Sequence, residues 1–472
     1  MQFAHVSSKI AKRYFSIELG RHMGLQNPRM RFDRKIRTGR SIFLQYYSHR
    51  RKDNSVFCFE LVITLMSTQE EYPSTTKVLY YPIPGDETGG RVFLFGLPSA
   101  FRSNRDAVIS RIVLLCAGFP DDCTALQPLA ARLASGDEND IDDAAADTTN
   151  KDGVTVCGVT CLVGYDSHKP YTDYYCRDGY TPEQTVTALR EATKVLWNTC
   201  ACSDSDSYNK QDKNNNNHNP ELIGVFHDWA CVFGNILVNQ LATETESTTT
   251  ASSRLFHFSR VVHLDILLPL HPNFIQQLPD AISLQLRKKR RPSLFTLVAM
   301  VTYQTVLVIS YLLHRYISKY AAMAWLIPCF MILGILGMAP GNRQDAKLIQ
   351  RRMKTDYLDL GRMTYMAFTY YYMYKTMFLA IPRNWNDLPI FLPPNLTDIP
   401  HLYMYGADKK FHFHDETALA YLEYQSQKHQ KQPTGHTASF PSKVVPVKGA
   451  GHWLYLQKPD VCFHAIREFL QR

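Results

Sequence analysis

Residues 222–230 read LIGVFHDWA, and this stretch decides the fold that we expect. Its apolar start predicts a buried strand, and a helix-compatible run follows, so the chain must turn sharply at Asp228. A side chain on such a turn projects from the tip of the strand, as in a nucleophile elbow. The stretch therefore places a carboxylate where a nucleophile is expected. The alternative is that Asp228 caps the following helix.

The residues around Asp228 bear on both the turn and the chemistry. An elbow requires small residues two positions before and after its tip, and Ala230 satisfies this requirement whereas Phe226 does not. A carboxylate at the tip can attack an electrophilic carbon and form a covalent alkyl ester, which water then cleaves. An esterase would need a serine at this position, so esterase chemistry is disfavoured.

Other compact apolar runs on both sides of the elbow are typical of buried parallel strands. Helix-compatible stretches follow several of them, and this alternation predicts an α/β fold with a mostly parallel sheet flanked by helices. In such sheets the ligand site lies beyond the carboxyl ends of the strands. The predicted strands are 111–116, 154–163, 222–226, 260–264, 402–405 and 444–447, preceded by short β-rich runs at 55–66, 78–82 and 91–95.

The alternation breaks between residues 264 and 402, where two long apolar stretches occur at 294–313 and 320–339. We expect a helical lid here, inserted above the strand ends and continued by helices at 347–357 and 365–378. The first stretch is about long enough to cross a bilayer, which takes roughly 20 residues. Two alternatives remain open: a hairpin in a membrane, or an apolar lid lining a pocket for a lipophilic substrate.

Two loops supply further candidates at the strand ends. His452 lies on a glycine-flanked loop, residues 449–453, between the last strand and a final helix at 461–470, which suits a general base. Residues 118–121 follow the first well-marked strand, and Gly118 lets this loop turn closely. Backbone N–H groups of Phe119 and Trp229 are therefore candidates for an oxyanion hole.

A third group must orient the histidine and stabilise its charged form. Asp408 follows the strand at 402–405, and Asp265 ends the strand at 260–264. Both stand at carboxyl ends of predicted strands, so the sequence leaves two candidates for the acid.

Together these segments resemble the α/β-hydrolase superfamily, specifically its branch of epoxide hydrolases and haloalkane dehalogenases. The matching motifs are residues 118–120, His227-Asp228-Trp229 and residues 449–453. The nucleophile motif precedes the expected lid, and the histidine loop follows it, which is the order of this branch. The resemblance implies an Asp nucleophile acting on a lipophilic, epoxide-like small molecule without any cofactor or metal. It also implies two lid tyrosines that hydrogen-bond the epoxide oxygen, for which we take Tyr303 and Tyr365 from a set that includes Tyr311, Tyr316, Tyr357 and Tyr370 to Tyr372.

Three positions depart from the pattern of this branch. Ala117 stands where a histidine is usual, Phe226 where a small residue is usual, and Lys409 where the acid is usual, three residues after Gly406. Some dehalogenases place the acid after the preceding strand, which favours Asp265 slightly over Asp408. The departures also support an alternative, a catalytically impaired hydrolase fold that serves in binding or at a membrane.

Composition divides the 472 residues into four predicted parts: a basic extension 1–54, a first core segment 55–268, an apolar lid 269–390 and a second core segment 391–472. The net charge of +9 is concentrated in residues 1–52 of the extension, where only Glu18 and Asp33 are acidic. Such an extension is typical of a mitochondrial transit peptide, of a surface for anionic lipid, or of a solvated tail. No nucleic-acid motif accompanies the charge, and the eleven cysteines lack the spacing of zinc ligands. We therefore expect neither a nucleic-acid partner nor a bound zinc ion. Polar tracts at 137–152, 203–219 and 243–253 are expected to be surface loops.

Overall fold

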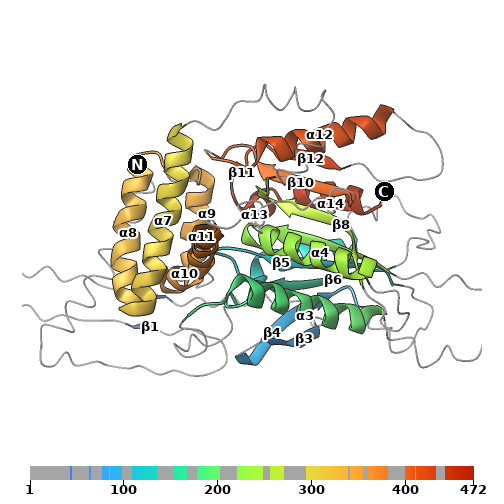
Figure 1. The fold of residues 1–472 in the computed structure, drawn as a ribbon, viewed down its shortest axis with the longest axis horizontal. Helices are drawn as coiled ribbons and strands as arrows, with labels where there is room; N and C mark the ends of the chain where they lie inside the picture. The colour runs from blue at the N-terminus through green and yellow to red at the C-terminus, as the bar shows by residue number, and fades with distance from the viewer. Residues whose placement is uncertain are drawn as a thin grey trace, which may run out of the picture.

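Six strands paired in parallel, extended at one edge by two antiparallel pairings, form the central sheet of the computed structural model, in the order β12-β10-β8-β7-β5-β6-β4-β3 (Figure 1). The structure describes residues 43–44, 63–64, 77–83, 86–97, 109–136, 154–166, 178–201, 220–247, 256–269, 294–338, 341–354, 360–380, 399–409, 411–431 and 442–471.

Every run predicted as a parallel strand is a strand of this sheet, although β6 ends two residues earlier than expected. With helices on both faces, the sheet confirms the predicted α/β-hydrolase fold. Its strands are β3 (Lys77–Ile83), β4 (Asp86–Phe95), β5 (Ile109–Ala117), β6 (Val154–Cys161), β7 (Glu221–His227), β8 (Phe258–Leu264), β10 (His401–Gly406) and β12 (Lys443–Val447). Two small pairs stand apart, β1 (Phe43–Leu44) with β2 (Ile63–Thr64) and β9 (Ile266–Leu267) with β11 (Phe413–His414).

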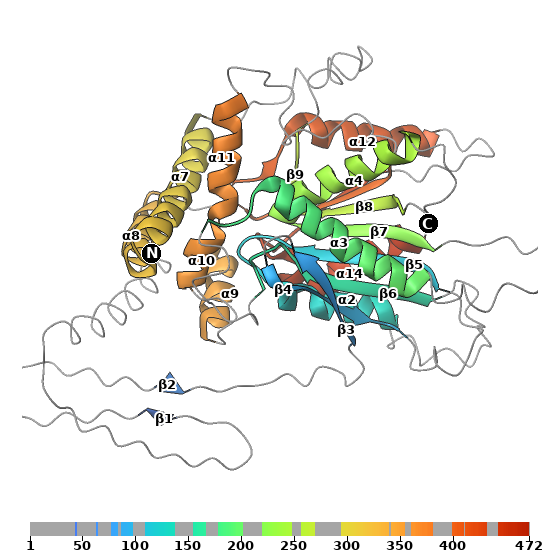
Figure 2. The same cartoon turned by 60° about the horizontal axis from the view of Figure 1, so that its bottom comes forward.

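Helices cover both faces of the sheet, as its almost continuously apolar strands require. On one face, α3 (Pro182–Ala201) packs beside α4 (Trp229–Ser247), and Arg190 pairs with Glu244 between them (Figure 2). On the other face, α2 (Gln127–Ser135) follows the 3-10 helix η2 (Cys123–Leu126) and packs beside α14 (Pro459–Gln471). Helices α12 (Glu416–Lys431) and α13 (Leu454–Gln457) complete the core.

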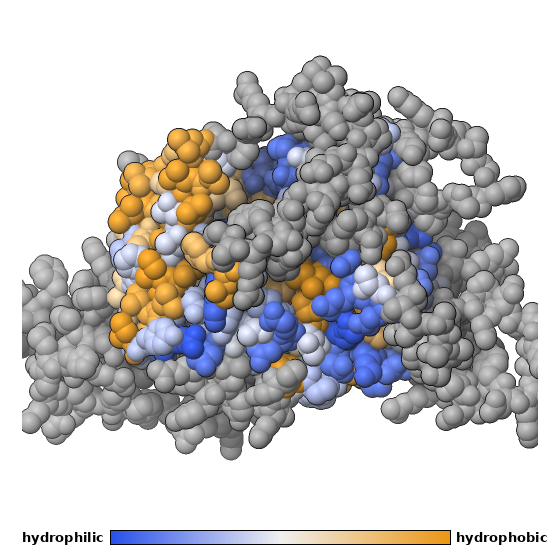
Figure 3. All heavy atoms as spheres, viewed as in Figure 1, coloured by the Kyte–Doolittle hydropathy of each residue, from blue (hydrophilic) through white to orange (hydrophobic). Residues whose placement is uncertain are grey.

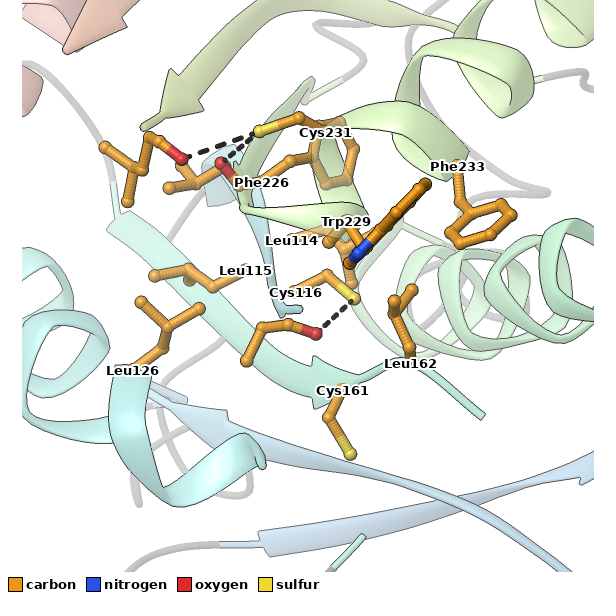
Figure 4. Packing of buried hydrophobic residues seen from close by; sticks show 14 of the residues in the cluster. Leu114, Leu115, Cys116, Leu126, Cys161, Leu162, Phe226, Trp229, Cys231 and Phe233 are labelled. Atoms are coloured by element: carbon orange, nitrogen blue, oxygen red, sulfur yellow. Dashed lines mark hydrogen bonds between the residues drawn. The ribbon is translucent and has the colours of Figure 1, made fainter. Parts of the chain in front are cut away.

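The first turn of α4 is held against the strand ends by buried contacts (Figure 4). The thiol of Cys231 donates to the carbonyl of Phe226 at 3.1 Å and to that of Leu264 at 3.7 Å. Leu114 and Leu115 of β5 are fully buried beneath this turn. Close packing here fixes where β7 ends, and with it the position of the next residue, Asp228.

Between β9 and β10 the residues that the structure describes form five helices, which we call the helical insertion, at one end of the sheet (Figure 1). They are α7 (Leu294–Tyr316), α8 (Lys319–Ile335), α9 (Arg343–Lys354), α10 (Leu360–Met366) and α11 (Phe368–Ala380). Both long apolar stretches are thus helical. The aromatic run 365–378, expected as one helix, is instead divided at Ala367 between α10 and α11.

One expected loop is partly wrong: α4 continues to Ser247, so the Thr/Ser-rich tract 243–253 begins inside a helix. Within the described part of the tract, the hydroxyl of Thr243 donates to the carbonyl of Asn239, and Glu244 pairs with Arg190, so both residues have partners within the helical layer. The tracts 137–152 and 203–219 lie outside the described residues, as does the basic extension except for Phe43 and Leu44. The interpretations of that extension therefore stay predictions.

Candidate active site

Asp228 alone forms the turn between β7 and α4, and its φ is 54°. A positive φ is uncommon outside glycine, and aspartate is among the residues that adopt it most readily. The loop of residues 118–121 runs directly against this turn: a Cβ on Gly118 would lie 2.4 Å from the carbonyl oxygen of His227. The structure therefore contains the sharp strand-to-helix turn that the sequence indicates at Asp228.

Phe226, the bulky residue before the turn, is accommodated by two glycines. Its side chain is fully buried, and a Cβ on Gly224 or on Gly234 would lie 2.5–2.6 Å from atoms of its ring. The ring also meets Phe258 edge-on, with centroids 6.0 Å apart. The small residue that the elbow needs at position 226 is thus replaced by small residues facing Phe226 from β7 and α4.

Asp228, His452 and Asp265 converge although they come from three different segments. His452 Nδ1 donates to Asp265 Oδ2 at 2.6 Å, and His452 Nε2 lies 3.8 Å from Asp228 Oδ2. Asp265 follows β8 and has a φ of 81°. The imidazole therefore stands between the two carboxylates, the arrangement in which an acid orients a base beside a nucleophile.

Asp408, the alternative acid, lies elsewhere. Its carboxylate accepts a hydrogen bond from the backbone N–H of Gly449 at 3.2 Å, and its side chain is exposed. The next residue points inward: Lys409 Nζ lies 2.5 Å from Asp265 Oδ2. The structure thus brings Asp265 to His452 and leaves Asp408 as a stabiliser of the histidine loop, because the turn after β10 directs successive side chains oppositely.

Burial and charge shift the pKa values of these groups in a coupled way. Burial raises the pKa of Asp228 to about 6, against the opposing effect of the His452 charge. Burial also disfavours protonated His452, but the carboxylates of Asp265 and Asp228 outweigh it and raise that pKa to about 9. Burial would likewise raise the pKa of Asp265, which the charges of Lys409 and His452 instead hold below its usual range. At neutral pH the site therefore contains a carboxylate–imidazolium pair.

The two oxyanion candidates occupy different positions. The backbone N–H of Trp229 donates to Asp228 Oδ1 at 2.6 Å, so Oδ2 is the oxygen that faces His452. Phe119 contacts the site through its carbonyl oxygen, 3.3 Å from His452 Nε2, and through its ring, which packs edge-on against Tyr370. The candidate role of the Phe119 N–H stays a prediction.

Tyrosines of the helical insertion reach Asp228, but they are not the pair expected from sequence. The side chains of Tyr303 in α7 and Tyr370 in α11 are hydrogen-bonded to each other, and the charge of Asp228 acts on both. Tyr370 also stacks edge-on against Trp229, with centroids 4.9 Å apart. Tyr365 instead packs against His314 and Phe368. The break at Ala367 rotates α11 relative to α10, which brings Tyr370 rather than Tyr365 to the site.

Helix α9 is attached to the site by two residues that the sequence did not single out. Asp345 accepts from the backbone N–H of His452 at 3.0 Å, and Arg352 forms an ion pair with Asp121, which is fully buried. Trp453 Nε1 donates to the same Asp121 at 2.7 Å. Asp345 and Arg352 are seven residues apart, two helical turns, so they share one face. This seven-residue spacing is the feature of the sequence that could have indicated that both side chains face the site.

His227 is buried beside the histidine loop, and burial and the nearby His452 lower its pKa to about 3. Its neutral ring contacts the carbonyl oxygen of His452 at 3.3 Å through Nε2. Ligand atoms of His227, Asp265 and His452 lie within 4.8 Å of one another, as a metal site would require. Because the ammonium of Lys409 already occupies Asp265 Oδ2, a metal ion would meet a neighbouring positive charge, and the donor set fits a metal poorly.

No family model matches the chain, and no curated protein matches its sequence. Its structure is similar to an epoxide hydrolase mutant of Vigna radiata, with 13% identity and a TM-score of 0.38 over 84% of this chain and 99% of that one. A haloalkane dehalogenase of Agrobacterium tumefaciens gives 13% and 0.38, over 84% and 97%. An esterase of Thermogutta terrifontis gives 11% and 0.38, over 84% and 98%. What this chain does is therefore inferred from its own residues.

The packing of Phe226 against Gly234 generates a prediction about stability. Gly234→Ala improves helix propensity, yet its Cβ would meet the Phe226 ring at 2.6 Å, so we expect a loss of about 1–3 kcal/mol in the free energy of unfolding. Phe226→Leu combined with Gly234→Ala should lose less than the two single changes together. Urea denaturation measures both quantities, and a Gly234→Ala protein as stable as the parent would contradict this account.

Proposed function

We propose that the chain is a hydrolase that opens an epoxide-like electrophile in a lipophilic small molecule through an alkyl ester on Asp228. The single observation that carries the proposal is the line Asp228–His452–Asp265, with distances of 3.8 Å and 2.6 Å, at the carboxyl ends of β7 and β8. A carboxylate nucleophile, a histidine base and an orienting acid are the groups that such a reaction needs.

The first step forms the ester. Asp228 Oδ2 attacks a ring carbon, and the carbon–oxygen bond of the epoxide breaks with its electron pair left on oxygen. Tyr303 and Tyr370 donate hydrogen bonds to that oxygen, as two lid tyrosines do in the epoxide hydrolases that the sequence resembles. The oxygen finally gains the proton of the His452 imidazolium, which leaves His452 neutral.

The second step hydrolyses the ester. Neutral His452 takes a proton from water, and the hydroxide attacks the ester carbonyl, whose developing oxyanion accepts from the Trp229 N–H. The bond to the product oxygen then breaks, and that oxygen takes the proton of the new carboxylic acid. Asp228 returns as a carboxylate and His452 as an imidazolium. Esterification removes one of the charges that raise the pKa of His452, so the histidine more readily stays neutral and free to accept a proton when water must be activated.

We further propose that the helical insertion is a lid that lies in the surface of a membrane. Leu294, Ile335 and Phe378 are 76%, 68% and 67% exposed, and they stand at the start of α7, the end of α8 and near the end of α11. We call these three residues and their apolar neighbours the apolar tip; Figure 3 shows the apolar surface over α7 and α8. Five consecutive basic residues, 287–291, precede α7 in the sequence and would attract anionic headgroups by about 1 kcal/mol each.

The contacts of α7 favour an interfacial position over a spanning one. Helix α7 (Leu294–Tyr316) is long and apolar enough to cross a bilayer, with a mean hydropathy of 1.7 over its most apolar stretch. Only 28% of that stretch is buried in the protein. Its inner face, however, packs into the protein: Leu307 and Tyr311 are fully buried, and Tyr303 bonds to Tyr370. Moving α7 into the hydrocarbon would break these contacts, whereas an interfacial helix keeps one face on the protein.

Replacement of the nucleophile and the base tests the enzymatic proposal. Asp228→Asn should abolish turnover of a panel of lipophilic epoxides without changing the fold, because an amide cannot form the ester. His452→Gln should allow one turnover and trap the ester as a mass increase on the peptide that contains Asp228. Turnover by Asp228→Asn at the parent rate would show that the protein is not this kind of enzyme, and it would leave the binding alternative.

The pKa of Asp228 predicts the acid side of the pH profile. Ester formation needs ionised Asp228, whose pKa is about 6, and protonated His452, whose pKa is about 9, so kcat/KM should be constant between these two pH values. It should fall about tenfold per unit as the pH decreases through 6, because the protonated carboxyl does not attack. The rate of ester formation, followed by stopped flow with a chromogenic epoxide, provides the measurement. A rate that stays constant down to pH 4 would exclude Asp228 as the nucleophile.

Flotation with vesicles of phosphatidylcholine and phosphatidylserine tests the membrane proposal. The double variant Leu294→Asp with Phe378→Asp should lose about tenfold in bound fraction, since a charge at the surface of the apolar tip opposes insertion. Val461→Asp on α14, which is 45% exposed and lies outside the insertion, is the matched control and should bind as the parent does. Carbonate should release the bound parent. A parent that stays wholly soluble would refute membrane association, and resistance to carbonate would indicate spanning helices instead.

A further inference from the structure

Lys409 is a buried cation within the candidate site. Its side chain is 1% exposed, and its ammonium lies 2.5 Å from Asp265 Oδ2 and 4.5 Å from the centre of the Phe413 ring. Removing an ammonium from water costs several kcal/mol unless a partner of opposite charge compensates, so a buried Lys409 requires such a partner. The partner is the very carboxylate that orients His452.

The two cationic groups share one oxygen of Asp265. Oδ2 accepts from Lys409 Nζ at 2.5 Å and from His452 Nδ1 at 2.6 Å. Oδ1 of Asp265 is buried and has no hydrogen-bond partner among the described atoms. The negative charge of Asp265 is therefore divided between Lys409 and His452 instead of serving the histidine alone.

Charged groups reach His452 from each element packed around it. Asp228 at the elbow and Asp265 after β8 favour its protonated form, and Lys409 after β10 opposes it. His227 of β7 is neutral, and Asp345 of α9 accepts from the His452 backbone N–H. Lys409 is therefore the group that counterbalances two carboxylates. Burial lowers the pKa values of His412 and His414, and the Lys409 charge lowers them further.

We propose that Lys409 is a positioning residue that holds the Asp265 carboxylate toward His452 and, by its charge, keeps His452 able to take a proton from water. The inference rests on the proposed role of His452. It also accounts for a departure noted in the sequence: the position that holds the acid in the resembled family holds its counter-ion here, because the acid has moved to the end of the neighbouring strand.

Titration of His452 by NMR tests the inference without any substrate. Protein labelled with carbon-13 at histidine Cε1 would be titrated, and the His452 signal would be assigned by its loss in His452→Gln. Lys409→Met removes the charge and keeps the length of the side chain, so the pKa of His452 should rise by about one to two units. Lys409→Arg keeps the charge and should leave that pKa near the parent value. Lys458→Met, which removes an exposed cation from the end of α13, is the matched control and should also leave it unchanged.

A second variant covers the case in which Lys409→Met does not fold. Lys409→Gln retains a hydrogen-bond donor for Asp265 and should shift the pKa of His452 in the same direction. An unchanged or lower pKa in the folded neutral variants would overturn the inference, as would an equal shift in Lys409→Arg, which would mean that shape and not charge matters. If the parent also hydrolyses an epoxide, the acid limb of ester hydrolysis should move upward with the pKa in Lys409→Met. If it hydrolyses none, the titration still decides the role of Lys409 separately.

Discussion

The hydrogen bond from the backbone N–H of Asp228 to the carbonyl of Leu264, 3.2 Å long, joins the ends of two parallel strands, and the site depends on it. It ties the turn after β7 to the turn after β8, each formed by an aspartate with positive φ. Such conformations cost on the order of 1–3 kcal/mol each and persist only where the surroundings fix them. Here the buried thiol of Cys231 and the hydrogen bond from Asp265 N–H to Met404 provide that support. The result is two carboxylates projecting from adjacent strand ends, with room for one imidazole between them.

The fold and the nucleophile candidate were predictable because their signals are local. A buried parallel strand requires an apolar run, and a residue at a strand-to-helix turn is identified by its neighbours in the sequence. Phe226 departs from the expected pattern for the same reason. The local pattern of an elbow predicts a small side chain at that position, whereas the space for the Phe226 ring is provided by Gly234, eight residues later and on a different element. The sequence states what occupies each position, but not which positions face each other.

The choices between alternatives were decided by tertiary geometry. Asp265 and Asp408 are equally plausible from their places after strands, and only the direction of the turn after β10 separates them. Tyr370 takes the place expected for Tyr365 because the helix breaks at Ala367. No glycine or proline near this position indicates the break in the sequence. Helix α7 shows the same dependence on context: Tyr303 faces the site while Val298 and Val301 of the same helix face outward. Amphipathic spacing indicates that a helix has two faces, and the packing determines what each one meets.

The attachment of α9 has a consequence for how the chain folds. Arg352 pairs with Asp121 across 231 positions of sequence, and Asp345 holds His452 across 107. Contacts between such distant segments form slowly, since a long loop must close before any of them can stabilise it. The oxyanion candidates, the base and the insertion therefore come together only when these long-range contacts have formed. A ribosome that has not yet released residue 452 carries a chain that lacks the candidate base, so the candidate site is completed only near the end of synthesis.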